Sequence, residues 1–172
     1  MSPLRIDTAE FTRRGEHAEG RLELASLERL ATLLESTDGT LDWRLDGRSV
    51  LRPDGSRQPL LGLRLEGRMA MRCVRCLDPV EVALEVSRDY RLVSSEAQAE
   101  GEDLDDDDRD LLVGDRGFDL AALIEDEAIM ALPAAPRHAD CRIAAATSGL
   151  PPAEEARRPF EVLERLRGRG SG

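Results

Sequence analysis

Hydrophobic and polar positions alternate most clearly between residues 60 and 92. Apolar side chains occupy every second position, and their phase changes across residues 76–79: Leu61, Leu63, Leu65, Met69, Met71 and Cys73 precede the change, and Val80, Val82, Leu84, Val86, Tyr90 and Leu92 follow it. Because successive side chains of a strand face opposite sides of a sheet, each half predicts a strand with one wet face. The short break between them predicts a long antiparallel hairpin with Cys73 and Cys76 at its tip.

Weaker patterns before this hairpin predict further elements. Residues 18–24 alternate and predict a short strand. Apolar residues at helical spacing after Ser26 predict a helix over 26–35 with Ser26 as its N-cap, and the stripe is Leu27, Leu30, Ala31 and Leu34. Alternation over 41–45 predicts a half-buried strand, with Gly47 in a turn or bulge, and residues 53–56 (PDGS) predict a turn.

The sequence after the hairpin predicts mainly helices. Asp119 can cap a helix that runs to about Leu132, where Pro133 ends it. Residues 111–113 could add a brief strand, and Pro159 suits the first turn of a short C-terminal helix. The expected fold class is therefore α+β: a largely antiparallel sheet with a long central hairpin, and helices packed on one face.

The length of the chain indicates a single domain. With 172 residues and a mass of 19.0 kDa, it can bury one core. We expect an N-terminal segment at 1–17, one domain at 18–167 with an acidic flexible loop at 98–117, and a disordered tail at 168–172. No apolar run is long enough to cross a membrane, and no secretory signal is recognisable, so a cytoplasmic protein is expected.

Charge is concentrated in one short segment. The net charge is −11, and residues 100–110 hold eight carboxylates and one Arg, so the rest of the chain is nearly balanced. The overall acidity argues against non-specific binding of nucleic acid over the whole surface. The segment itself could bind a basic partner through Glu102, Asp103, Asp105, Asp106, Asp107 and Asp108.

Two pairs of candidate metal ligands share the same spacing. Cys73-x-x-Cys76 lies at the predicted hairpin tip, and His138-x-x-Cys141 follows the predicted helix. A two-residue gap in a turn lets both donors reach one ion, and four such ligands complete a structural zinc site. Ordinary thiols are the main alternative. Dithiol redox chemistry is another, although a redox C-x-x-C normally opens a helix and this one ends a strand.

Two groups of charged residues have a structural and a functional interpretation. An arginine stripe on the wet face and tip of the hairpin could hold phosphates, or it could pair across strands with Glu81, Glu85 and Asp89; the stripe is Arg64, Arg68, Arg72 and Arg75. Residues 125–127 (EDE) could serve as a general acid or base, but a solvated face or pairing with arginine accounts for them more simply.

Three sequence blocks together resemble one family. CVRCLDPV at 73–80, FDLAALIEDEAIMALPAAPRH at 118–138 with the trailing Cys141, and RPFEVLERL at 158–166 occur in the order and spacing typical of the YceD family of large ribosomal RNA subunit accumulation proteins. The resemblance covers residues 20–167. Many members carry further cysteines in a stretch where this chain has Gly149-Leu150-Pro151-Pro152.

The resemblance implies a function that composition and spacing do not. It implies a cytoplasmic, non-enzymatic binding protein needed for the accumulation or processing of large-subunit (23S) ribosomal RNA. Its partner would be that RNA or a basic large-subunit ribosomal protein, with one structural zinc as the only cofactor and no small-molecule substrate. A zinc-dependent or thiol enzyme, and an adaptor that binds no nucleic acid, are the alternatives.

Overall fold

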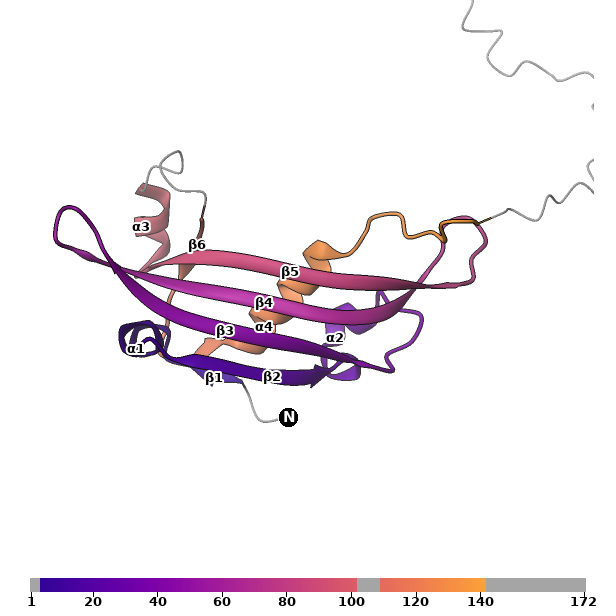
Figure 1. Ribbon diagram of the computed structural model, residues 1–172, viewed down its shortest axis with the longest axis horizontal. Coiled ribbons are helices and arrows are strands. Elements are labelled where there is room, and N and C mark those ends of the chain that lie inside the picture. Colours follow the sequence, from indigo (N-terminus) through magenta and orange to yellow (C-terminus); the bar gives the residue numbers. More distant parts are fainter. Residues whose placement is uncertain (1–3, 102–108, 142–172) are drawn as a thin grey trace, which may run out of the picture. The chain divides into compact units, whose positions relative to one another are not determined.

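The core of the protein is a five-stranded sheet. The computed structural model describes residues 4–101 and 109–141, and in this part the strand order is β2-β3-β4-β5-β6 (Figure 1). The strands are β2 (His17–Glu23), β3 (Thr40–Leu51), β4 (Arg57–Arg72), β5 (Pro79–Val93) and β6 (Asp110–Val113). The first four pair antiparallel and β6 joins β5 in parallel. The predicted α+β class with a largely antiparallel sheet is confirmed.

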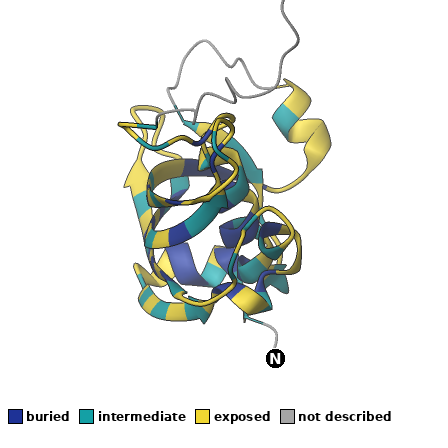
Figure 2. Ribbon diagram, turned by 90° about the vertical axis from the view of Figure 1, so that its right-hand side faces the viewer, coloured by how far each residue is buried: buried dark blue, intermediate teal, exposed yellow. Residues whose placement is uncertain are grey.

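Helices cover one face of this sheet. The helix α4 (Leu120–Ala131) runs behind the strands in Figure 1, and α1 (Thr8–Arg14) and α2 (Glu28–Ala31) lie on the same side. Their apolar residues join those of the strands in one buried cluster (Figure 2). Leu30, Leu63 and Ile124, from three different elements, are each fully buried there. The opposite face of the sheet is exposed and charged.

The central hairpin has the predicted form. β4 and β5 pair from Leu60, opposite Arg91, to Arg72, opposite Pro79. Their apolar positions face the helices while the residues between them face solvent, as the phase of the sequence predicted. The predicted turn at 53–56 is also present, because Arg52 donates a backbone hydrogen bond to Ser56 over 2.8 Å.

The predicted helix over 26–35 is present only as a single α-helical turn, so its predicted bounds are wrong. The chain instead forms the 3₁₀-helix η1 (Leu24–Ser26) and the single-turn α2. Ser26 is not an N-cap, since its hydroxyl donates back to the carbonyl of Glu23 over 2.7 Å. Leu24, Leu27 and Leu30 are all buried at a three-residue spacing, which suits a tighter winding than an α-helix. The chain then leaves the helix, and Glu35 donates to the Ala70 carbonyl of β4.

The segment before residue 17 is part of the same packed structure. β1 (Arg5–Ile6) pairs with β7 (Phe118–Asp119) just before α4, and α1 buries Phe11 in the core. Gly47 is neither a turn nor a bulge, because it lies in the regular register of β3 opposite Leu61. A Cβ there would stand 2.6 Å from Cδ1 of Phe11, so the glycine lets α1 approach the sheet.

The segment around the acidic run contains regular structure. The helix α3 (Glu96–Gly101) follows β5 and has no buried residue, and β6 begins at Asp110. Both therefore fall within or beside the predicted flexible loop of 98–117. The carboxylates at 102–108, the predicted C-terminal helix and the predicted tail lie outside the described residues. No helix in the described ranges is long and apolar enough to cross a membrane.

Candidate metal centre

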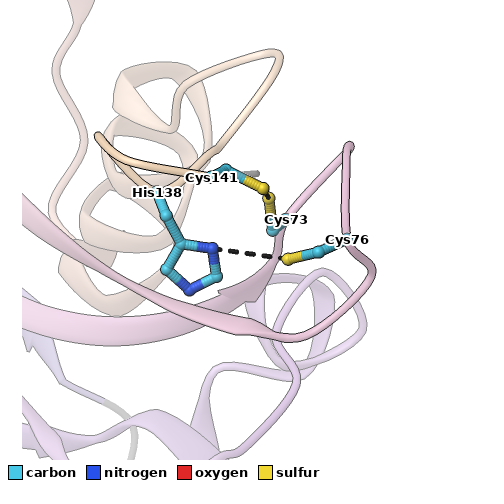
Figure 3. Close-up of side chains that lie close together, drawn as sticks. All are labelled: Cys73, Cys76, His138 and Cys141. Atoms are coloured by element: carbon cyan, nitrogen blue, oxygen red, sulfur yellow. Dashed lines mark hydrogen bonds between the residues drawn. The ribbon is translucent and has the colours of Figure 1, made fainter. Parts of the chain in front are cut away.

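The four candidate metal ligands meet at one point of the fold. Cys73 and Cys76 lie in the turn between β4 and β5, and His138 and Cys141 lie in the segment after α4 (Figure 3). One ligand atom from each residue lies within 4.8 Å of all the others. Residues separated by more than sixty positions are thus brought together as a group that could hold a metal ion.

Two distances within this group match the edges of a tetrahedral zinc site. The sulfurs of Cys73 and Cys141 are 3.7 Å apart, and the Cys76 sulfur is 3.5 Å from Nδ1 of His138. Zinc binds sulfur at about 2.3 Å and imidazole nitrogen at about 2.0–2.1 Å, so the edges of such a tetrahedron measure about 3.8 Å and about 3.5 Å. All three cysteines are free thiols, and a disulfide would need the sulfurs at about 2.05 Å.

The backbone of the turn shapes the cysteine side of the site. Cys73 donates to the carbonyl of Asp78 over 2.9 Å, and Leu77 donates to the carbonyl of Cys73 over 3.0 Å. These bonds close the turn tightly around the C-x-x-C pair. Leu77 has a φ of 67°, a left-handed conformation that a branched, bulky residue adopts at an energetic cost. The turn therefore holds a strained residue next to the second cysteine.

A second hydrogen bond orients the histidine. Nε2 of His138 lies 3.0 Å from the carbonyl oxygen of Pro79, an acceptor that places the ring proton on Nε2. Nδ1 is then left with its lone pair directed at Cys76 (Figure 3). Metal-binding histidines are commonly oriented in this way by a carbonyl on the far ring nitrogen. The carbonyl of Pro79, the first residue of β5, thus orients the ring so that Nδ1 can coordinate a metal ion.

The surroundings of the thiols separate their pKa values. The backbone amide of Cys76, helped by that of Arg75, outweighs burial and lowers the pKa of Cys73 to about 5. The Asp78 amide alone would lower the pKa of Cys76, but burial and the neighbouring sulfurs raise it to about 11. The Cys73 sulfur, followed by the Pro79 carbonyl, raises the pKa of His138. At neutral pH the metal-free site therefore already holds one thiolate.

A backbone hydrogen bond also joins the hairpin tip to the segment after α4, and it involves none of the four candidate metal ligands. Val74 donates to the carbonyl of Pro136 over 2.9 Å, and Pro136 is buried. The guanidinium of Arg75 also reaches the carbonyl of Cys141 at 3.4 Å. The segment after α4 is consequently docked on the hairpin tip by main-chain contacts as well as by the four side chains.

Most arginines of the stripe already form hydrogen bonds or ion pairs within the protein. Arg68 pairs with Glu81 at 2.8 Å, Arg72 with Glu35 at 2.6 Å, and Arg75 bonds the Cys141 carbonyl. Arg64 alone of the four has no ion pair or hydrogen bond with the described residues. It lines a hollow on the exposed sheet face in which arginines and carboxylates are equal in number: Glu19, Arg21, Asp42, Arg44, Arg64 and Glu66.

The carboxylates of α4 are paired with arginines and amides. Glu125 accepts from the backbone amides of Arg29 at 2.7 Å and Leu30 at 3.1 Å, and from Nε of Arg29 at 2.9 Å. It therefore caps the N-terminus of α2 from a different helix, a role that the sequence did not reveal. Asp126 also binds Arg29, and Glu127 binds Arg88 of β5 at 3.1 Å. The structural interpretation of 125–127 is confirmed.

The architecture and the four clustered ligands indicate which class of protein this chain belongs to. The class is an α+β domain in which a hairpin tip and a helix-following segment bring together a Cys₃His group that could bind a metal ion. The family model for large ribosomal RNA subunit accumulation protein YceD matches residues 61–167. This range includes all four Cys and His residues, and the chain belongs to the YceD family.

A curated relative supports this assignment over nearly the whole chain. It is a Haemophilus influenzae protein named large ribosomal RNA subunit accumulation protein YceD, 30% identical over 176 residues. The alignment covers 96% of this chain and 95% of the relative. No solved structure matches the chain.

Proposed function

We propose that this protein supports the accumulation of large-subunit ribosomal RNA as a non-enzymatic binding protein. Its membership of the YceD family carries the proposal, together with a named relative that it matches from end to end. The site chemistry favours a structural role, because four protein donors complete a tetrahedron and leave no open position for a substrate. The α4 carboxylates are engaged in ion pairs and caps, so they offer no free acid or base.

We infer that the Cys₃His group holds one structural zinc ion. Three sulfurs come from Cys73, Cys76 and Cys141, and one nitrogen comes from His138. Such a donor set binds zinc in preference to hard cations such as Mg²⁺. When bound, the ion would fasten the segment after α4 to the hairpin tip. That contact closes a loop of more than sixty residues, which costs conformational entropy unless something holds it.

We propose a basic ribosomal protein of the large subunit as the direct partner. The net charge of −11 attracts a basic surface and repels phosphates. Both large aromatic side chains of the sheet, Trp43 and Tyr90, are buried, so the exposed face has none on which RNA bases could stack. Three of the four arginines of the stripe bind groups within the protein, which leaves Arg64 as the stripe's main candidate for an RNA phosphate.

Deletion of the gene tests the function itself. The ratio of large-subunit to small-subunit ribosomal RNA should fall in the deletion strain, and a plasmid copy of the wild-type gene should restore it. An unchanged ratio, with no precursor of the large-subunit RNA accumulating, would contradict the proposal.

Purification of the tagged protein from cells tests the partner. We expect a basic large-subunit ribosomal protein to remain bound after ribonuclease treatment and to be lost at high salt. A variant that carries Asn or Gln in place of the acidic residues at 102–108 should retain less of it, with Glu81→Gln as a control that removes charge elsewhere. Loss of all partners after ribonuclease would instead favour direct RNA binding.

A further inference from the structure

The strand β2 forms an open edge of the sheet. It is the terminal strand of the order β2-β3-β4-β5-β6, and it lies at the lower margin of the sheet in Figure 1. No described strand pairs with its outer side. β2 is seven residues long, whereas the opposite edge strand, β6, has four. It contains no proline, one of the usual means of protecting an edge from pairing with another chain.

The pairing of β2 with β3 shows which backbone groups point outward. Gly47 donates to the carbonyl of Glu16 at one end, and Leu24 donates to the carbonyl of Gly39 at the other. Hydrogen-bonded and non-bonded pairs alternate along an antiparallel ladder, so the even-numbered residues of β2 bond to β3. The amides and carbonyls of the odd-numbered residues therefore face the open side: His17, Glu19, Arg21 and Glu23.

The sequence of β2 is complementary to itself in one antiparallel register. When Gly20 lies opposite Gly20 of a second copy, Glu19 faces Arg21 of that copy and Arg21 faces its Glu19. In the same register His17 faces Glu23, and Ala18 faces Leu22 on the side of the core. Every outward backbone group then meets an outward group, since the pairs that exchange hydrogen bonds in this register, Glu19 with Arg21 and His17 with Glu23, are all odd-numbered. Opposite charges on neighbouring strands stabilise such pairs, and like charges destabilise them.

We propose that β2 pairs antiparallel with β2 of a second copy of this chain, so that two sheets join into one across a two-fold axis at Gly20. The contact is isologous, as in most homodimers. Each Glu19–Arg21 pair exchanges two backbone hydrogen bonds and adds one ion pair. Glycine at the axis brings no side chain to the closest approach of the two strands.

The neighbouring strand extends the charge pattern. Arg44 of β3 binds Glu19 at 3.0 Å, and Asp42 binds Arg21 at 2.6 Å. Across the joined sheets one row would read Arg44, Glu19, then Arg21 and Asp42 of the second copy, with the sign alternating at every step. The side chains of Glu19 and Arg21 are 60% and 65% exposed, so both are accessible to a second chain. A contact of one strand edge is small, so a weak, concentration-dependent dimer is expected.

A charge-reversal pair tests this contact by sedimentation equilibrium of the full chain over a range of concentrations. Arg21→Glu places a glutamate opposite each Glu19, and Glu19→Arg places an arginine opposite each Arg21, so both opposite-charge pairs of the dimer become like-charge pairs. Each variant should weaken self-association at least tenfold. An equimolar mixture of the two variants pairs acid with base at both positions and should dimerise again. A wild-type protein that is monomeric throughout, or variants that self-associate like the wild type, would overturn the proposal.

Hydrogen exchange of the wild-type protein provides a second test without any substitution. The amides of Glu19 and Arg21 should become protected as the concentration rises, while those of Gly20 and Leu22, already bonded to β3, should be protected at every concentration. Protection of Glu19 and Arg21 that does not depend on concentration would mean that another part of the same chain covers the edge, and would overturn the proposal.

Discussion

Nε2 of His138 lies 3.0 Å from the carbonyl oxygen of Pro79, the first residue of β5. The strand that follows Cys73 and Cys76 thus orients the histidine that lies with them in the candidate metal site. The orientation is set by the backbone, so it persists whichever side chain stands at position 79. It leaves Nδ1 as the only ring nitrogen available to a metal ion.

Substitution of His138 should therefore separate ligand loss from structural damage. His138→Ala removes one donor and should lower the zinc affinity by about 100-fold or more, because even outer-shell partners are worth about 10–100-fold. His138→Cys supplies a sulfur in its place and should retain one metal ion per chain. Competition with a chromogenic chelator measures both. Equal zinc affinity in the wild type and His138→Ala would exclude the histidine as a ligand.

Removal of the metal should expose a pH dependence set by Cys73. Its pKa is about 5 in the native state against 9.0 for the unperturbed thiol, so the folded protein gains stability as the pH rises from 5. The raised pKa of His138 acts in the opposite sense, but its contribution is lost only above its ordinary value of 6.5. Between pH 5 and 6.5 the melting temperature of the chelated protein should therefore increase.

Cys73→Ser is the control for that pH dependence. Without the thiol, the rise between pH 5 and 6.5 should be smaller, because serine does not ionise in this range. Thermal melts of both chelated proteins, followed by circular dichroism, give the comparison. The same slope in both proteins would show that Cys73 is not the group responsible.

Glu125 should contribute more to stability than its exposed neighbour. It is buried and accepts from two backbone amides and a guanidinium, which together outweigh burial and hold its pKa below the usual range. Glu125→Ala leaves buried amides unsatisfied and should cost about 2–3 kcal/mol. Asp126→Ala removes a pair whose side chains are about half exposed and should cost under about 1 kcal/mol. Urea denaturation measures both, and equal losses would contradict the capping role.

The central hairpin was predictable because its signal is local. Alternation of Leu63 and Leu65 with charged residues sets the buried face of β4 without reference to the rest of the chain. The region 26–35 was not predictable from its own residues. Its short helix is capped by Glu125, almost a hundred positions away, and the chain after the helix is held to β4 by a backbone bond from Glu35.

The candidate metal ligands were recognisable because their two-residue spacing carries the chemistry. What the sequence could not supply was the carbonyl of Pro79 that orients His138, or the bond from Val74 to Pro136, since backbone groups leave no mark in a sequence. The packing of α1 was missed for a similar reason. Gly47 was interpreted as a turn or bulge residue, whereas it is required by the approach of Phe11, 36 positions upstream.

Gly47→Ala tests that approach. The added methyl would meet Cδ1 of Phe11 at 2.6 Å and its carbonyl oxygen at 2.8 Å, so α1 must shift, at a cost of about 1–3 kcal/mol. Gly101→Ala is a suitable control, since nothing lies within 4 Å of a Cβ at that position. Denaturant unfolding compares the two, and a Gly47→Ala protein as stable as the control would mean that α1 does not pack tightly on β3.

The metal content of the purified protein tests the central claim most directly. Elemental analysis of protein purified without added metal should give about one zinc per chain for the wild type and almost none for Cys73→Ser. Because zinc binding contributes to folding, Cys73→Ser should also lose on the order of 3 kcal/mol and exchange amide hydrogens faster at 134–141, while β4 and β5 stay protected. A wild-type protein that contains no zinc, and whose melting temperature does not rise when zinc is added, would show that the four residues are not a metal centre.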